Sequence, residues 1–257
     1  MLKGLYTAYT GLRNEQYRMD IMSNNLANSS TVGFKKEGST SQSFDAVLAH
    51  KLNDTTEIGD FPHRIGYNNP GVKIGEVYND FSQGSFQVTE NTYDLALSGD
   101  GFFTIQFTNK AGDVSTKYTR AGDFTLNTDG YLVTKDGDYV MGTNGRIRLD
   151  TNAESAINKD GTITQNGVMV AKLRITAFED YDYLVKYGET YFESVEGAKE
   201  IASDAEVFSG YLEASNVQVV SEMVDMINIT RAYESNQKIM QTYDSTLEVA
   251  ANQLGRL

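Results

Sequence analysis

The sequence has 257 residues and a net charge of −13, with no cysteine and only two histidines. An acidic chain pairs poorly with phosphate, which argues against nucleic acid as a partner, and the missing cysteines exclude disulfides and thiolate chemistry. No apolar run approaches the ~18 residues of a membrane-spanning helix, and the first residues have no secretory character, so we expect neither membrane insertion nor a cleaved signal peptide.

A long helix is predicted at the start of the chain, over residues 3–28. Its apolar stripe consists of Leu5, Leu12, Met19 and Leu26, each seven residues from the next. This spacing places the stripe on one face of a helix and is typical of the seam of a coiled coil. Glycines at positions 4 and 11 each lower helix propensity by about 1 kcal/mol, so packing must stabilise the helix. Turn-forming residues end the pattern at 28–33.

The segment 35–84 is predicted to be an extended connector, because most of it is rich in Ser, Asn, Gly and charged residues. Phe44–Lys51 could form a short helix within it. The order of apolar and polar residues in 35–84 predicts no helix or strand as clearly as it does in the neighbouring segments. The acidic segment 179–210 likewise has no clear helix or strand pattern.

An antiparallel β domain is predicted over residues 85–212. Short β-branched and aromatic runs alternate there with six Asp-Gly or Asn-Gly dipeptides, which begin at residues 100, 129, 136, 144, 160 and 166. These dipeptides supply the positive φ that tight hairpin turns need. The period of two and the turn spacing therefore distinguish this domain from the ends of the chain.

A second long helix is predicted over residues 216–257. Its apolar stripe again repeats every seven residues, through Met226, Tyr233, Met240, Leu247 and Leu254. Neither Gly nor Pro occurs from 211 to 254, so the helix could reach ~40 residues, or about 60 Å. That length is unusual for a helix of a globular domain.

The residues that could carry chemistry are better explained as turns and loops. The run Thr125–Asp136 fits a calcium loop at some positions, but it begins with Thr and lacks a bidentate Glu at its end. The acidic run Glu179–Tyr183 holds neighbouring carboxylates, whereas a glycosidase needs two that face each other across a cleft. We therefore predict no catalytic residue, no metal site, no cofactor and no enzymatic activity.

The two helical stripes leave two interpretations open. The helices could pack on the β domain as ordinary amphipathic helices. Alternatively, they could pack against each other and against copies in neighbouring subunits, since the β domain between them is predicted to form its own core. Contacts between copies that do not close on themselves produce helical filaments.

Three stretches of the sequence resemble the bacterial flagellar rod and hook protein family. Near the start, the family pattern is matched by Asn24, Asn25, Leu26, Ala27, Asn28, Thr31, Gly33, Phe34 and Lys35. Near the end, it is matched by 210–217 with Glu213 and Asn216, and by 222–234 with Arg231, Tyr233 and Glu234. In the middle, residues 94–103 and 118–124, which include Arg120, are similar to the rod branch of the family.

This resemblance implies a structural subunit of the flagellar basal-body rod, most like the distal rod protein, with a proximal rod or hook-type axial protein as the alternative. In that family the terminal helices form a coiled-coil inner layer of a helical tube, and the β domain lies outside it. Implied partners are copies of the chain, other rod and hook subunits, and possible contacts with surrounding ring proteins and the export apparatus. The implied location is the flagellar basal body outside the cytoplasmic membrane, reached by type III export.

Together these observations predict an α+β fold with a discontinuous helical assembly domain at 1–34 and 213–257. The connector and the β domain fill 35–84 and 85–212. The segment 24–34 should form the turn out of the inner layer, with Gly33 allowing a bend and Phe34 anchoring it. The alternative from another class is a secreted glycan-binding or hydrolytic β protein whose helices form only a stalk.

Overall fold

The computed structural model describes residues 2–45, 47–51, 63–109 and 112–254. The chain has an α+β fold, with one long helix near each end and antiparallel sheets between them. It divides into two compact units: a helical unit of 1–26, 37–78 and 219–257, and a β unit of 27–36 and 79–218. Most of the expected connector therefore belongs to the helical unit.

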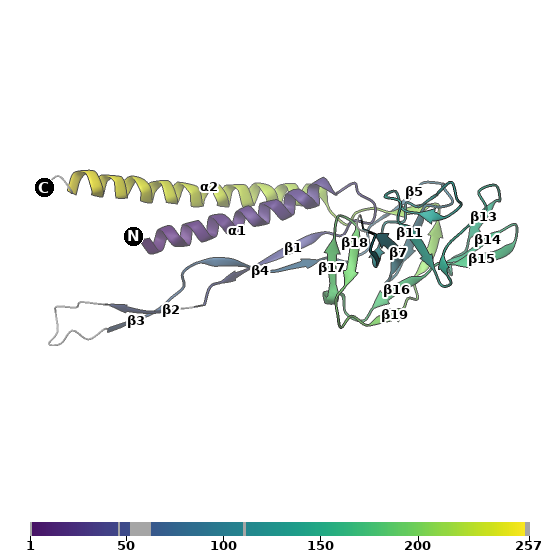
Figure 1. Cartoon of the computed structure of the whole chain (residues 1–257). Coiled ribbons are helices and arrows are strands. Elements are labelled where there is room, and N and C mark those ends of the chain that lie inside the picture. Colours follow the sequence, from purple (N-terminus) through teal and green to yellow (C-terminus); the bar gives the residue numbers. More distant parts are fainter. Residues whose placement is uncertain (1, 46, 52–62, 110–111, 255–257) are drawn as a thin grey trace. The chain divides into compact units, whose positions relative to one another are not determined.

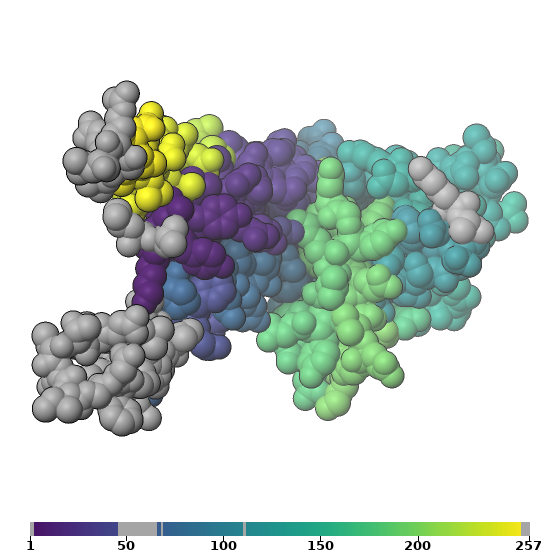
Figure 2. Space-filling model, turned by 60° about the vertical axis from the view of Figure 1, so that its left-hand side comes forward, coloured from purple at the N-terminus to yellow at the C-terminus, as the bar shows by residue number. Residues whose placement is uncertain are grey.

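The helical unit is built around α1 (Leu2–Ala27) and α2 (Val219–Val249), which confirms both predicted helices. A short π-helical segment, η2 (Ala250–Leu254), continues α2. The helices run in opposite directions side by side, so that the start of α1 lies near the end of α2 (Figure 1). Figure 2 shows the same neighbours as space-filling surfaces, with α1 in purple beside the yellow end of α2. No helix in the described part of the chain is long and apolar enough to cross a membrane.

Four strands complete the described part of the helical unit. β1 (Glu37–Ser43) pairs with β4 (Val72–Asn79), and β2 (Val47–Lys51) pairs with β3 (His63–Asn68). The short helix expected over Phe44–Lys51 is therefore wrong, because β2 forms an antiparallel ladder with β3, interrupted by a register shift after Ala49. Pairing with a distant strand overrides the local propensity of such a short segment.

The β unit is a set of short antiparallel strands, as predicted. The main described sheet runs in the order β17-β18-β8-β7-β11-β10-β9, with β12, β16 and β19 attached, and smaller sheets are β13-β14-β15, β6-β20 and β5-β21. In chain order the elements are β5 (Phe86–Val88), β6 (Leu95–Ser98), β7 (Phe102–Thr108), β8 (Val114–Thr119), β9 (Thr125–Leu126), β10 (Leu132–Val133), β11 (Tyr139–Gly142), β12 (Gly145–Arg146), β13 (Ser155–Ile157), β14 (Thr162–Gln165), β15 (Val168–Lys172), β16 (Ile175–Phe178), η1 (Tyr181–Tyr183), β17 (Leu184–Tyr187), β18 (Tyr191–Ser194), β19 (Glu200–Ala202), β20 (Glu206–Ser209) and β21 (Tyr211–Glu213).

The predicted turns hold with one exception. Asn166 and Gly167 have φ values of +51° and +79° and join β14 to β15 as a tight hairpin. Asp100-Gly101, by contrast, joins strands of different sheets, because β6 pairs with β20 while β7 belongs to the main sheet. The acidic run near 180 forms a capped turn, in which Asp182 N–H donates to the Asp180 carboxylate at 3.0 Å.

Two apolar clusters fill the β unit. The larger lies between the sheets and includes fully buried Leu95, Phe103 and Ile163. The smaller is aromatic, with Phe102, Tyr118, Phe178 and Phe192 at its centre and Phe81 packed against it. These clusters give the β unit a closed core of its own.

Candidate assembly site

The contact between α1 and α2 follows a regular antiparallel register. A Cβ on Gly4 would lie 2.2 Å from the Tyr243 hydroxyl oxygen, and one on Gly11 would lie 3.1 Å from Asn236 Nδ2. Fourteen residues, or about four turns, further along α1, Asn25 Nδ2 donates to Glu222 Oε2 at 3.4 Å. Each step to the next contact is seven or fourteen residues on both helices, in opposite directions. The glycines that weaken the helix therefore lie in close contact with side chains of α2.

The predicted stripe residues lie beside this line of contact. Leu5, Leu12, Met19 and Leu26 on α1 are half-buried, as are Met226, Tyr233 and Met240 on α2. A second row on α2, at positions 222, 229, 236 and 243, lies next to this half-buried row. Glu222 and Ile229 of the second row are fully buried. Sequence analysis missed this second row because two of its four members are polar and break the apolar pattern.

Leu247 continues the predicted row but is 37% exposed. In the register set by Gly4 and Gly11, position 247 of α2 lies beyond the first residue of α1. Position 247 of α2 therefore has no described residue of α1 opposite it. Leu254 ends the π-helical segment η2.

Asn25, in the middle of the first family motif, clamps the chain that returns along α1. Its Nδ2 donates to the Glu37 carbonyl at 2.8 Å, and its Oδ1 accepts from Glu37 N–H at 3.0 Å. The paired bonds satisfy a backbone donor and acceptor at the start of β1 with one buried side chain. Asn24 and Ala27, on the same turn of helix, are exposed.

The turn after α1 is shorter than the predicted segment 24–34, because α1 continues as a helix through Ala27. Thr31 Oγ1 donates to Asn28 Oδ1 at 3.1 Å. Gly33 has φ +67°, and a Cβ there would lie 2.2 Å from the backbone nitrogen of Ala121, so only glycine fits. Phe34 is completely buried, and its role as an anchor of the turn stays a prediction.

Lys35, Glu213 and Arg120 form a buried charge cluster in the β unit. Lys35 Nζ lies 2.6 Å from Glu213 Oε1, and Arg120 Nη1 lies 3.3 Å from Glu213 Oε2. All three side chains are at most 4% exposed. Burial lowers the pKa of Lys35 from its usual value, and the Glu213 carboxylate partly opposes that shift. One carboxylate thus ties the segment after α1 to strand β21 and to the end of β8.

Asn216 makes the next tie between the same parts of the β unit. Its Oδ1 accepts from Lys36 N–H at 2.8 Å, and its Nδ2 donates to the Asp80 carbonyl at 2.8 Å. The paired bonds hold the segment before α2 against the chain on both sides of the β1–β4 excursion. The remaining motif residues on α2 differ in exposure, since Arg231 and Glu234 are exposed and Tyr233 is half-buried.

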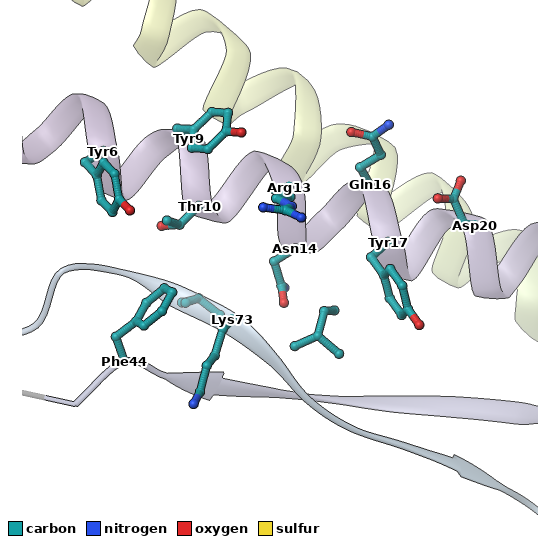
Figure 3. Close-up of a pocket in the computed structure, with 12 residues that line it drawn as sticks. Tyr6, Tyr9, Thr10, Arg13, Asn14, Gln16, Tyr17, Asp20, Phe44 and Lys73 are labelled. Atoms are coloured by element: carbon teal, nitrogen blue, oxygen red, sulfur yellow. The ribbon is translucent and has the colours of Figure 1, made fainter. Parts of the chain in front are cut away.

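A groove of about 610 Å³ runs between α1 and the strands of the helical unit (Figure 3). Tyr6, Asn14 and Tyr17 point from α1 toward the strand that carries Lys73. Tyr6, Tyr9 and Tyr17 are 57%, 47% and 45% exposed. The described residues contain no group of three or more His, Asp or Glu side chains that could hold a metal ion.

Comparison with known proteins accounts for the three motif regions. Residues 5–35 match the model "Flagella basal body rod protein", 96–165 match "Flagellar hook protein FlgE/F/G D1 domain", and 209–254 match "Flagellar basal body rod FlgEFG protein C-terminal". The flagellar basal-body rod protein FlgG of Bacillus subtilis (strain 168) is 35% identical over 98% of this chain and 99% of its own length. The chain belongs to the flagellar basal-body rod protein family.

Two further relatives of this rod-family chain define its range of similarity. The flagellar basal-body rod protein FlgF of Caulobacter vibrioides is 34% identical over 97% of the chain and 96% of its own length. The flagellar hook-basal body complex protein FlhO of Bacillus subtilis is 29% identical and covers both chains completely. These names describe structural components of the flagellum, which supports a basal-body protein with a structural role.

The family motifs of this rod-family chain meet in its buried cluster. Lys35 belongs to the first matched region and Glu213 to the last, and Arg120 lies in the central one. Sequence analysis quoted Glu213 and Arg120 within motifs without assigning them a role. A charged residue within a predicted buried strand is the signal that could have identified them. Charged residues are rarely buried unless they are paired, so such a residue predicts a partner of opposite charge.

Proposed function

We propose that this rod-family chain is an axial subunit of the flagellar rod, and that it polymerises into a helical tube through its terminal helices. Distal rod is the first position proposed and proximal rod or a hook-type axial position the second. Relatives named FlgG and FlgF match almost equally, at 35% and 34% identity, so both positions stay within the proposal. The predicted seam residues become coiled-coil contacts between neighbouring subunits.

The observation that carries this proposal is the incomplete packing of the helix pair. Leu247, near the end of α2 and opposite no described residue of α1, is 37% exposed. Both helices also keep large apolar or aromatic side chains exposed, including Tyr6, Val220 and Ile227. Exposed apolar surface of this kind on helices marks an interaction site. Neighbouring copies in a tube would supply the missing cover.

The proposal extends to partners and location. Copies of the chain, other rod and hook subunits, and surrounding ring proteins are the proposed neighbours, with the export apparatus as the proposed route out of the cytoplasm. The proposed site of action is the basal body outside the cytoplasmic membrane, reached without a cleaved signal peptide, and the proposed role involves no catalysis.

The test replaces Leu247 with Asp. Because Leu247 is 37% exposed, the substitution should leave the folded subunit intact, whereas in a packed seam a carboxylate costs several kcal/mol. Motility and the amount of subunit in purified basal bodies should both fall strongly. Glu248→Lys, about 100° around the helix, is the matched control and should be mild. Normal swimming and wild-type incorporation of Leu247→Asp would show that the helices do not form the seam.

A further inference from the structure

Two arginines on the surface of the β unit each lie against a tyrosine ring. Arg146 Cζ is 4.1 Å from the centroid of the Tyr139 ring, and Arg148 Cζ is 5.7 Å from the centroid of the Tyr131 ring. The two rings meet edge to face, with their centroids 5.5 Å apart. A guanidinium stacked on a ring is held through its flat face, while the N–H groups at its edge stay available. We call these four side chains the Arg–Tyr surface.

The backbone turns both arginines to the same side. Arg146 on β12 pairs with Met141 of β11, and Arg148 forms an isolated bridge with Tyr131. Ile147 between them is 1% exposed, whereas both arginines are exposed. Side chains two residues apart in an extended chain share a face and lie about 7 Å apart. The Arg–Tyr surface thus presents two positive charges at the spacing of a strand.

Both arginines keep hydrogen-bond donors to spare. Within the part of the chain that the structure describes, the Arg146 side chain has its ring contact and one hydrogen bond, from Nε to Gln106 Oε1 at 2.7 Å. The Arg148 side chain has its ring contact alone among the described residues. The two Nη groups of each guanidinium, which together bind a carboxylate, are therefore left for a partner. Arg174 of the same unit differs, because it already donates to Glu200 Oε2 at 3.0 Å.

The charges around the Arg–Tyr surface favour a short acidic partner. Asp129 and Asp150 line the same hollow of about 590 Å³ as Arg148, but no ion pair joins either of them to it in the described structure. The whole chain carries a net charge of −13. A long polyanion would be repelled by these negative charges beyond the two arginines. Two carboxylates at the spacing of the arginines would be neutralised without extending into that repulsion.

We propose that the Arg–Tyr surface binds an extended acidic segment of another protein, in which two carboxylates are separated by one residue. Alternate side chains of such a segment repeat every ~7 Å on one face, which matches the spacing of Arg146 and Arg148. Each carboxylate accepts two hydrogen bonds from one guanidinium, and the residue between them points away. Such a contact goes beyond the proposed function, because every residue in it belongs to the β unit and none to the terminal helices.

The test measures the fluorescence anisotropy of labelled peptides added to the full chain, held as a verified monomer. The probe is a peptide of about ten residues of Thr and Ser that contains two Glu separated by one residue. The control peptide has the same composition but adjacent Glu residues, which point to opposite faces of an extended chain. The probe should bind about tenfold more tightly than the control. Equal affinity, or no binding of the probe, would overturn the proposal.

Substitutions in the chain identify the surface that binds the probe. Arg146→Gln and Arg148→Gln should each weaken binding about tenfold. Arg146→Lys should restore only part of the loss, because an ammonium keeps the charge but not the paired donors. Arg174→Gln makes the same change at an arginine that Glu200 already occupies, so it should leave binding unchanged. Equal effects of Arg146→Gln and Arg174→Gln, or full binding by Arg146→Lys, would overturn the proposed contact.

Two other occupants give results of their own. Inorganic polyphosphate that binds more tightly than the probe, and loses this binding in Arg146→Gln, would assign the surface to a polyanion. Self-association of the wild-type chain that Arg146→Gln abolishes would assign it to a second copy. Either result overturns the acidic segment as the occupant. The rod function does not depend on these outcomes, since Leu247→Asp tests it separately.

Discussion

The helical unit and the β unit of this rod-family chain differ in how completely they bury their own apolar surface. In the β unit, whole strands such as β6 and β7 contribute buried side chains to two clusters. In the helical unit, the buried apolar side chains among the described residues are Ala8, Ile21 and Ile229. The β unit is thus complete as a single chain, whereas the helical unit has a thin core and exposed apolar rows, which suits the proposed polymer.

The two units also use buried polar groups differently. In the β unit, Glu213 is shared by two buried cations at one fixed point. In the helical unit, the buried polar residues Asn25 and Glu222 lie in the contact between α1 and α2. Apolar residues at these two positions would make the two helices pack more tightly. Buried polar groups lower the stability of a helix pair but restrict its register. A weak, well-registered pair can keep its apolar rows available for neighbouring copies.

The largest expected difference between the units is in amide hydrogen exchange of the monomer. Residues 90–178 should exchange at the slow rate of global unfolding, because their strands are paired and many of them contribute side chains to the two buried clusters. The helices α1 (Leu2–Ala27) and α2 with η2 (219–254) should exchange at least about 100-fold faster, since local opening exposes little buried apolar surface. Exchange measured by mass spectrometry on dilute, verified monomer checks this. Equal protection of both units would contradict the comparison.

The next effect concerns the buried carboxylate of the β unit. Glu213→Ala leaves Lys35 and Arg120 as uncompensated buried cations, which should lower the free energy of unfolding by about 3–5 kcal/mol. Glu206→Ala is the matched control, because the Glu206–Lys159 pair is at 3.3 Å but both side chains are more than half exposed. Its loss should cost about 0–1 kcal/mol. Urea unfolding measures both, and similar values for the two variants would show that the buried cluster does not hold the unit together.

Much of the fold could be predicted from the sequence. Heptad spacing indicated both helices within a few residues, and Asn166-Gly167 indicated a hairpin that the structure confirms. The polar row that includes Glu222 and Asn236 could not be found by apolar periodicity, and the strand β2 depends on a partner in β3 that lies beyond local pattern. Residues 35, 120 and 213 meet only because distant strands pair, so sequence motifs identified them singly without revealing their contact.

A smaller effect is expected at the turn where the β unit receives the chain from α1. Gly33→Ala adds strain at φ +67° and a contact 2.2 Å from the Ala121 backbone nitrogen, so it should cost about 3 kcal/mol. Gly137→Ala has a similarly positive φ of +92° but no atom within 4 Å of its new Cβ. Gly137→Ala therefore introduces only the backbone strain of a positive φ, and it should lower the free energy of unfolding by about 1–2 kcal/mol. Thermal or urea unfolding compares them, and an equal cost would mean that the close approach to Ala121 contributes nothing.

The smallest effect is a pH dependence within the aromatic cluster of the β unit. Tyr118 is 2% exposed and donates to Glu200 Oε1 at 2.5 Å. Burial, together with this carboxylate, raises the pKa of Tyr118 to about 12 from 10.0. Because the folded pKa is raised, the neutral phenol stabilises the fold fully below pH 10, and this contribution is lost as pH rises toward 12. The loss should be about 2–3 kcal/mol.

Tyr118→Phe tests this dependence by removing the titrating group. The variant should be less stable at pH 7, where it lacks the bond to Glu200, but the gap between variant and wild type should narrow from pH 10 to 12. The lowered pKa of Lys35 acts in the opposite direction, with stability rising as pH increases toward 10.5, but it is present in both proteins and cancels in their difference. Urea unfolding at pH 8, 10 and 11.5 would give the two curves, and a Tyr118→Phe gap that stays constant or widens would show that the phenol does not titrate with the fold.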